Sequence, residues 1–172
     1  YYAYNLYWSG SHGCYTALHS LNFSQYAPGK YDAYVVLGNQ FKFGDAKLQI
    51  DLMNRGVSAK ELLFENFSIM GEFSYLVAER VNIFAKATYD KVGSGYPAGL
   101  FLYPGTEMTR VGAGLEFYPL KEGNRNLRFH AYFCQAFGKN GNPAGTMLPD
   151  QTLMDLGVKW KMDILSLTNK IF

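Results

Sequence analysis

Apolar and polar side chains alternate along most of this chain, most clearly over residues 109–137. One set of alternate positions in the first half of that stretch is mainly apolar: Thr109, Val111, Ala113, Leu115 and Phe117. After a turn at residues 119–124, the second half repeats the pattern with Leu127, Phe129, Ala131, Phe133 and Phe137. Because successive side chains of a strand point to opposite faces, the pattern predicts two antiparallel strands with one apolar and one charged face.

The same alternation predicts further strands, so we expect about nine antiparallel strands in a single all-β domain over residues 1–172. The additional strands are predicted at residues 1–8, 14–26, 31–43, 46–54, 65–77, 81–91 and 152–164. Tight turns are expected at residues 9–13, 28–30 and 44–45, and long connections at 92–107 and 138–151. Residues 58–63 could form a helix, but the segment is short and we expect a loop.

Strand length favours a membrane barrel over a soluble sheet. Most predicted strands have ten to thirteen residues, whereas strands of soluble sheets have about five or six. A tilted strand crosses a bilayer in about nine to eleven residues. The connections also alternate between short and long, as in outer-membrane barrels, whose periplasmic turns are short and whose outer loops are longer. We therefore expect a transmembrane, antiparallel, up-and-down β-barrel.

Charged residues inside the predicted strands lie on the face opposite the apolar series. In a barrel this face lines the lumen, and the following residues are predicted to do so: Lys42, Lys47, Asp51, Glu72, Lys86, Arg110, Glu116, Arg128, Lys159 and Lys161. The sorting of charges alone does not decide between the two architectures, because a soluble sandwich also keeps one face apolar for its core. A soluble all-β ligand-binding domain therefore stays open as an alternative.

Aromatic and small residues add to the barrel prediction. Aromatic side chains near the strand ends of the apolar face are typical of an interfacial girdle: Trp8, Tyr31, Tyr75, Tyr89, Phe117, Phe137 and Trp160. The charged face carries glycines that are expected to leave room in a lumen: Gly38, Gly112, Gly114 and Gly157.

Composition and motifs narrow the function classes. The net charge of +2 is too small to indicate a nucleic-acid partner, and no apolar run is long enough for a transmembrane helix. His12 and Cys14 have a spacing that metals can use but no further ligand nearby, and His130 has no partnered nucleophile. We therefore expect no metal, no cofactor and no enzyme activity. Cys14 and Cys134 are interpreted as two separate thiols.

Several segments resemble a known family. Residues 112–120 (GAGLEFYPL) followed by 127–132 (LRFHAY) resemble the penultimate hairpin of the phosphate-selective porin O and P family. Residues 49–55 (QIDLMNR) and 86–91 (KATYDK) resemble earlier strands of that family, in the form seen in Bacteroidota. The resemblance implies a sixteen-stranded barrel of the bacterial outer membrane, commonly trimeric, that passes small anions. An odd count of nine strands is then expected to be the C-terminal portion of the larger barrel.

The predicted lumen departs from a purely basic pore, because its acidic residues nearly match its basic ones. Lys159, Lys161 and Arg128 could form a basic ladder for anions, or could pair with three nearby acidic residues: Asp155, Asp163 and Glu116. We expect Arg110 and Glu116 to belong to the same network as Arg128. The predicted function is passive diffusion of small polar or anionic solutes, phosphate among the candidates. The alternative is a plugged barrel that serves as a structural or assembly subunit with other outer-membrane proteins.

Overall fold

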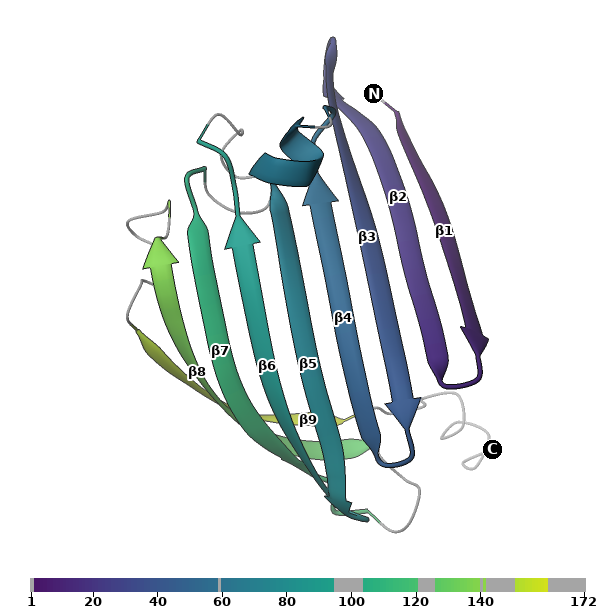
Figure 1. Cartoon of the computed structure of the whole chain (residues 1–172), viewed down its shortest axis with the longest axis vertical. Helices are drawn as coiled ribbons and strands as arrows, with labels where there is room; N and C mark the ends of the chain where they lie inside the picture. The colour runs from purple at the N-terminus through teal and green to yellow at the C-terminus, as the bar shows by residue number, and fades with distance from the viewer. Residues whose placement is uncertain are drawn as a thin grey trace, which may run out of the picture.

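The part of the chain that the structure describes folds into a single antiparallel sheet of nine strands in the order of the chain (Figure 1). The computed structural model describes residues 2–58, 60–94, 104–120, 126–139, 141 and 151–160. The strands are β1 (Ala3–His12), β2 (Tyr15–Ala27), β3 (Lys30–Phe43), β4 (Ala46–Arg55), β5 (Phe67–Ala78), β6 (Val81–Lys91), β7 (Glu107–Phe117), β8 (Leu127–Lys139) and β9 (Thr152–Trp160). One short helix of π type, η1 (Glu61–Glu65), lies between β4 and β5. The all-β, up-and-down arrangement predicted from the alternation is confirmed.

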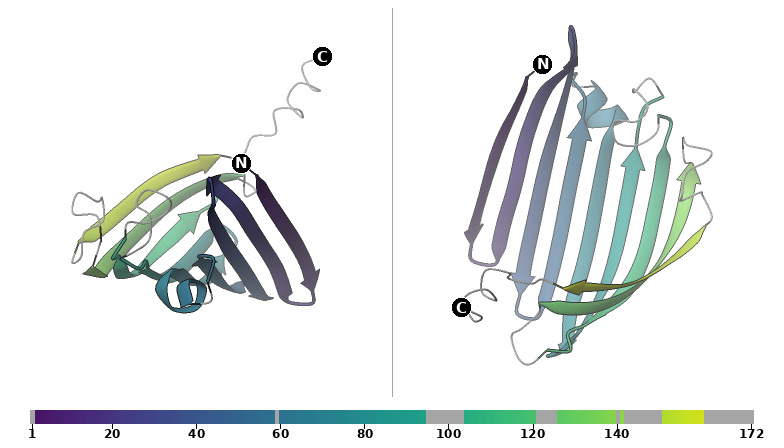
Figure 2. Two further views of the ribbon diagram at one scale, coloured as in Figure 1. Left: turned by 90° about the horizontal axis from the view of Figure 1, so that it is seen from above. Right: turned by 180° about the vertical axis from the view of Figure 1, so that it is seen from behind.

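The sheet is strongly curved and open. Each strand pairs with the next one along the chain, and β1 and β9 form the two edges. Figure 2 shows β8 and β9 turning back across the end of the sheet, so that one face is concave and the other convex. Closure into a barrel is therefore not part of the fold described here.

The tight turns follow the glycines, with one shift from the prediction. β1 continues to His12 and the turn to β2 is made by Gly13 and Cys14, so the turn expected over residues 9–13 is wrong. Gly13 has φ 56° and Gly44, in the β3–β4 turn, has φ 59°, a region that L side chains rarely adopt. The chain reverses at Gly13, which has a positive φ, and the polar residues 9–12 before it belong to β1.

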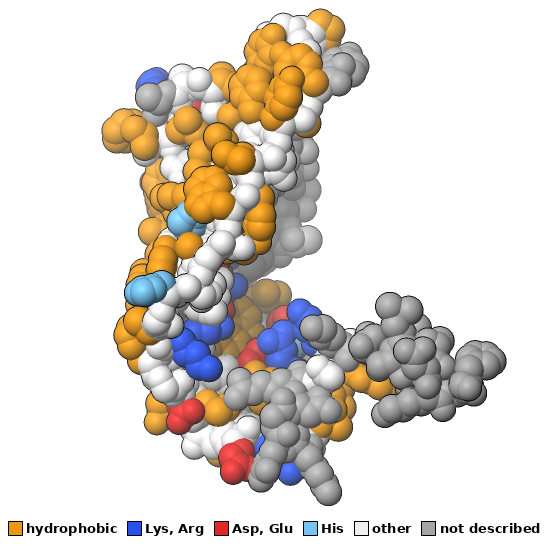
Figure 3. All heavy atoms as spheres, turned by 90° about the vertical axis from the view of Figure 1, so that its right-hand side faces the viewer, with side chains coloured by type: hydrophobic (Ala, Val, Ile, Leu, Met, Phe, Trp, Pro, Cys, Tyr) orange, Lys and Arg blue, Asp and Glu red, His pale blue; other side chains and the backbone are white. Residues whose placement is uncertain are grey.

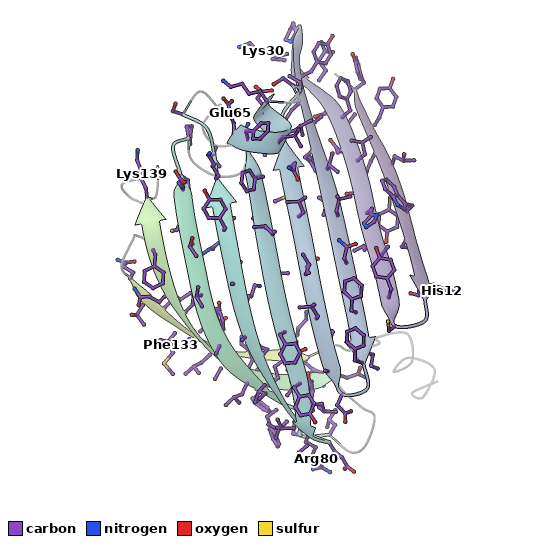
Figure 4. All side chains as sticks on the ribbon, in the orientation of Figure 1. His12, Lys30, Glu65, Arg80, Phe133 and Lys139 are labelled. Atoms are coloured by element: carbon purple, nitrogen blue, oxygen red, sulfur yellow. The ribbon has the colours of Figure 1, made fainter. Side chains whose placement is uncertain are left out.

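The two ends of the sheet differ in the length of their connections. At one end the connections have two residues between β1 and β2, β3 and β4, and β5 and β6, and nine residues, 118–126, between β7 and β8. At the other end the last three connections have 11, 15 and 12 residues (56–66, 92–106 and 140–151). Figure 4 places Lys30, Glu65 and Lys139 at this long-connection end and His12 and Arg80 at the opposite, short-turn end.

The helix η1 corrects the expectation of a loop after β4. The backbone N–H of Glu61 donates to Oγ of Ser58 over 3.2 Å, and the backbone N–H of Ser58 donates to Oε2 of Glu61 over 3.0 Å. This reciprocal pairing is the capping box, which satisfies free N–H groups at a helix start. The backbone N–H of Leu62 also donates to the carbonyl of Ser58. The Ser-x-x-Glu spacing of Ser58 and Glu61 therefore indicated a helix start in the sequence, although the segment is short.

No second layer covers the apolar side of the sheet within the described residues. Their buried apolar residues are Val92, Met108, Tyr118, Cys134 and Ala136, and none of the large side chains is fully buried. Large apolar residues are instead exposed, among them Leu156 at 65% and Phe133 at 56%. Both cysteines are free, as predicted. Among the described helices, none has the length and apolar character needed to span a membrane.

Candidate functional site: the concave face of the sheet

The strand register collects the charged side chains on one face. Gly38 pairs with Asp51, Glu72 with Lys86, and Glu116 with His130, so these positions share a side of the sheet across six strands. We call this side the concave face; its charged members are Asp32, Lys42, Lys47, Asp51, Arg55, Glu72, Lys86, Asp90, Arg110, Glu116, Arg128, Asp155 and Lys159. Figure 3 shows Lys and Arg side chains gathered in the hollow of the molecule. Lys161 and Asp163 lie outside the described residues.

The opposite, convex face is mainly apolar along the described strands β3 to β9, with Asn39 and Gln135 among its polar exceptions, and it carries charge only at its border. Its charged residues there are Lys91, Glu107 and Lys139, each at the terminus of its strand. Glu107 lies directly across from both lysines, and its Oε1 accepts a 2.8 Å hydrogen bond from the hydroxyl of Tyr89. We call these three residues the convex rim. On the convex face, charged side chains are therefore found only at strand termini, at the long-connection end of the sheet.

Two ion pairs lie on the concave face near the long-connection end. Nη2 of Arg55 is 2.5 Å from Oδ2 of Asp32, and both side chains are largely buried. Arg110 pairs with Asp90, which also accepts a 2.6 Å hydrogen bond from Ser68. A carboxylate that accepts several hydrogen bonds is fixed in position, so these pairs make this part of the face rigid.

A second cluster lies near the short-turn end. Nη1 of Arg128 is 2.6 Å from Oε1 of Glu116. The other oxygen of Glu116 accepts hydrogen bonds from the hydroxyl of Tyr118, at 2.5 Å, and from the amide of Asn82, at 3.0 Å. Glu116 is six residues from Arg110 along β7, about 20 Å. The expectation that Arg110 shares one network with Glu116 and Arg128 is therefore wrong, because strand geometry separates the two clusters.

Three lysines of the concave face have no carboxylate within 4.0 Å among the described residues: Lys42, Lys86 and Lys159. Lys159 lies directly across from Arg128. Asp155, which the sequence offered as its partner, instead contacts Nε2 of His130 at 3.3 Å. Of the pairings considered for the basic ladder, Arg128 with Glu116 is present and Lys159 with Asp155 is not.

The glycines of β7 and β9 do not leave open space, which corrects their predicted role. A Cβ atom on Gly112 would lie 2.6 Å from the hydroxyl of Tyr132, and one on Gly114 would lie 2.5 Å from Cζ of Phe84. A Cβ atom on Gly157 would meet the ring of His130. Because glycine has no side chain, these positions make room for the rings of residues on neighbouring strands.

The ring pair above these glycines was missed by the sequence analysis. Phe84 and Tyr132 are nearly parallel, with ring centroids 5.7 Å apart and an interplanar angle of 19°. Phe84 stands at a position of β6 that otherwise carries polar residues, so the break in alternation was the available signal. Two adjoining recesses of about 250 and 360 Å³ lie beside the second cluster, near the short-turn end of the sheet. Both are lined by Glu72, Glu116 and Arg128.

The described residues contain no group of three or more His, Cys, Asp or Glu side chains arranged to hold a metal ion. What the concave face offers is a set of fixed donors and acceptors along a shallow trough. Comparison with protein-family models, with curated proteins and with solved structures gave no match to this chain. The resemblance to the porin family accordingly stays a prediction.

Proposed function

We propose that this chain forms part of the wall of a β-barrel pore in the outer membrane of a Gram-negative bacterium. The observation that carries the proposal is the division of one sheet into an uncovered apolar convex face and a charged concave face. In the proposed arrangement the convex face contacts lipid and the concave face contacts water. Large exposed apolar surfaces are rare on soluble monomers, which supports lipid as the covering layer.

The spacing of aromatic residues on the convex face supports the same orientation. Tyr89, Thr109 and Phe137 lie side by side on three strands at the long-connection end. Phe117 and Phe129 lie side by side at the other end. Residues 109 and 117 are eight positions apart on β7, or about 26 Å along a strand. At the strand tilt of about 35–45° found in outer-membrane barrels, this interval spans about 18–21 Å across the membrane and fits within their ~25 Å apolar band.

The two free edges set a condition on barrel closure. Unpaired backbone groups are costly in lipid, so β1 and β9 need partner strands in a bilayer. The order of the sheet makes β1 and β9 run in the same direction. Antiparallel closure therefore requires an odd number of additional strands. The sixteen-stranded barrel implied by the family resemblance would add seven to these nine, which meets the condition.

Balanced charge supports a general pore for small polar solutes over a strongly selective one. The described concave face carries seven basic side chains and six acidic ones, and most of them are paired. Rings of a single charge produce ion selectivity, whereas compensated pairs produce little. In the proposed pore the unpaired lysines give a weak preference for anions, phosphate included.

The experiment is channel recording of the purified full-length protein in a planar bilayer. Extraction only with detergent and a steady conductance with a small anion preference in a salt gradient are expected. Strong cation selectivity would contradict the proposal. Extraction with detergent but no conductance would favour the plugged assembly subunit, and extraction without detergent would favour a soluble ligand-binding domain.

A further inference from the structure

The recess of about 250 Å³ on the concave face combines an aromatic pair with charged and polar side chains, among them Arg128 and His130, which each have a nitrogen without a hydrogen-bond partner among the described residues. We propose that it is a binding site for an uncharged, polyhydroxylated ring, namely a single sugar unit. The proposal rests on the proposed pore only for how the sugar reaches the site.

The aromatic pair supplies an apolar surface of fixed orientation. Phe84 and Tyr132 stack on one another and are both partly exposed in the recess. Gly112 and Gly114 lie beneath the ring edges, where any Cβ would clash. The glycines thereby let the two rings lie close against the sheet. The apolar C–H face of a sugar ring packs against an aromatic ring of this kind, which is the contact that recognises a ring without a net charge.

Charged and polar side chains line the same recess, and two of these residues have a nitrogen without a partner. Nε of Arg128 and Nδ1 of His130 are buried and lack a hydrogen-bond partner among the described residues. The amine of Lys86 lacks a carboxylate partner within 4.0 Å there. Glu72, directly across from Lys86, and Asp155, in contact with His130, add carboxylate acceptors to the lining of the recess. A hydroxyl group both donates and accepts, so neighbouring hydroxyls of one sugar can satisfy atoms of both kinds.

The balance of charge argues for an uncharged ligand. Three carboxylates line the recess with two permanent cations, Lys86 and Arg128, and with His130. Lys47 lies 3.8 Å from Glu72 and compensates the third carboxylate. An anion would meet the carboxylates and a cation would meet the basic groups, so neither has an advantage. The volume lies near the lower end of small-molecule sites, about 300 Å³, which fits one ring rather than an oligosaccharide.

The test is a titration of the full-length protein in detergent micelles with glucose and with maltose, followed by saturation-transfer NMR. Saturable binding in the range of about 1–10 mM is expected. F84A and F84L each remove the stacking surface and are expected to weaken binding about five- to tenfold. Y132F keeps the ring and is expected to stay within about twofold. F41A is the matched control, because Phe41 is also in an aromatic pair but on the convex face.

The absence of saturable binding up to about 100 mM would overturn the inference. Equal affinity in F84L and the unmodified protein, with circular dichroism showing the sheet intact, would also overturn it. Tighter binding of inorganic phosphate at the same atoms would do the same. Conductance is measured separately: sugar binding without conductance refutes the pore and keeps the site, and conductance without sugar binding refutes the site and keeps the pore.

Discussion

Arg128 and Glu116 form an ion pair between β8 and β7, with Nη1 and Oε1 2.6 Å apart. They are diagonal neighbours, because Glu116 lies directly across from His130. The carboxylate also accepts hydrogen bonds from Tyr118 and Asn82, and its side chain is 14% exposed. The pair is therefore held in place, and removal of either member leaves a charge without its partner on the concave face.

This relationship predicts opposite changes in ion selectivity for two isosteric variants. Glu116→Gln leaves the guanidinium uncompensated and is expected to move the reversal potential in a salt gradient toward anions. Arg128→Gln is expected to move it toward cations. The double variant restores the balance, so its reversal potential should return close to that of the unmodified protein. Identical potentials in all four proteins would show that the pair does not face the ion path.

Lys86 provides a second test of which face contacts the solution in the pore. It lies on the concave face without a described carboxylate partner, whereas Lys91 is on the same strand at the convex rim. Lys86→Glu is expected to shift the reversal potential toward cations, because it reverses an unpaired charge in the path. Lys91→Glu makes the same change in formal charge and is expected to produce a much smaller shift. A larger effect at Lys91 would place the path on the other face.

The covering of the convex face can be tested with a charge in its middle. Ala113 is exposed on β7, midway between the borders of the convex face at Thr109 and Phe117. Ala113→Arg is expected to lower the free energy of unfolding in lipid vesicles by about 2–4 kcal/mol, the cost of a charge at the bilayer midplane. Gln49→Arg, on the concave face, is the control and is expected to change it by less than about 0.5 kcal/mol. An equally small change for both variants would indicate that water covers the convex face.

The sequence predicted the strands and their faces because both depend on a local period of two. Leu37, Leu52 and Ile69 were assigned to the apolar series separately, and the register places them side by side on one face. Ion pairs were less predictable, because they depend on register. Arg110 pairs with Asp90 on the neighbouring strand rather than with a charge on its own hairpin.

The remaining errors came from features that alternation does not describe. The glycines of β7 were interpreted without the neighbouring rings that cover them, since a ring such as Tyr132 can lean across two positions of the next strand. The helix η1 was missed because length was weighted above the Ser58–Glu61 spacing. β1 and β9 are the edges of the described sheet and do not pair with each other, and alternation within a strand carries no information about what an edge pairs with.

Glycine contacts predict a difference between two alanine variants. A Cβ on Gly112 would meet the carbonyl oxygen of Phe133 and lie 2.6 Å from the hydroxyl of Tyr132. Gly112→Ala is therefore expected to lower the free energy of unfolding by about 1–3 kcal/mol, the usual result of overpacking. Gly71, on β5, has nothing within 4 Å of its Cβ position. Gly71→Ala is expected to be neutral or stabilising by up to about 1 kcal/mol in urea unfolding, because alanine restricts the unfolded chain.

The cap of η1 predicts a pH dependence confined to the β4–β5 connection. Burial acts to raise the pKa of Glu61, but hydrogen bonds from the N–H groups of Val57 and Ser58 and from the Ser58 hydroxyl lower it below its ordinary value of 4.5. A carboxylate whose pKa is lower in the folded state stabilises that state fully above the unfolded pKa, and the stabilisation disappears as pH falls through the folded pKa.

The amide NMR shifts of Val57 and Ser58 are therefore expected to titrate together with a midpoint below 4.5. Glu61→Gln removes the titrating group and should abolish that transition at both amides. Ser58→Ala keeps the carboxylate but loses the hydroxyl, so the midpoint should rise toward the ordinary value, with a local cost of about 1 kcal/mol. Glu65, at the last position of the same helix, instead forms an ion pair with Lys60, with Nζ and Oε1 2.7 Å apart. Glu65→Gln is therefore the control and should leave both amide titrations unchanged. A transition that persists in Glu61→Gln would assign the titration to another carboxylate and remove the cap as its cause.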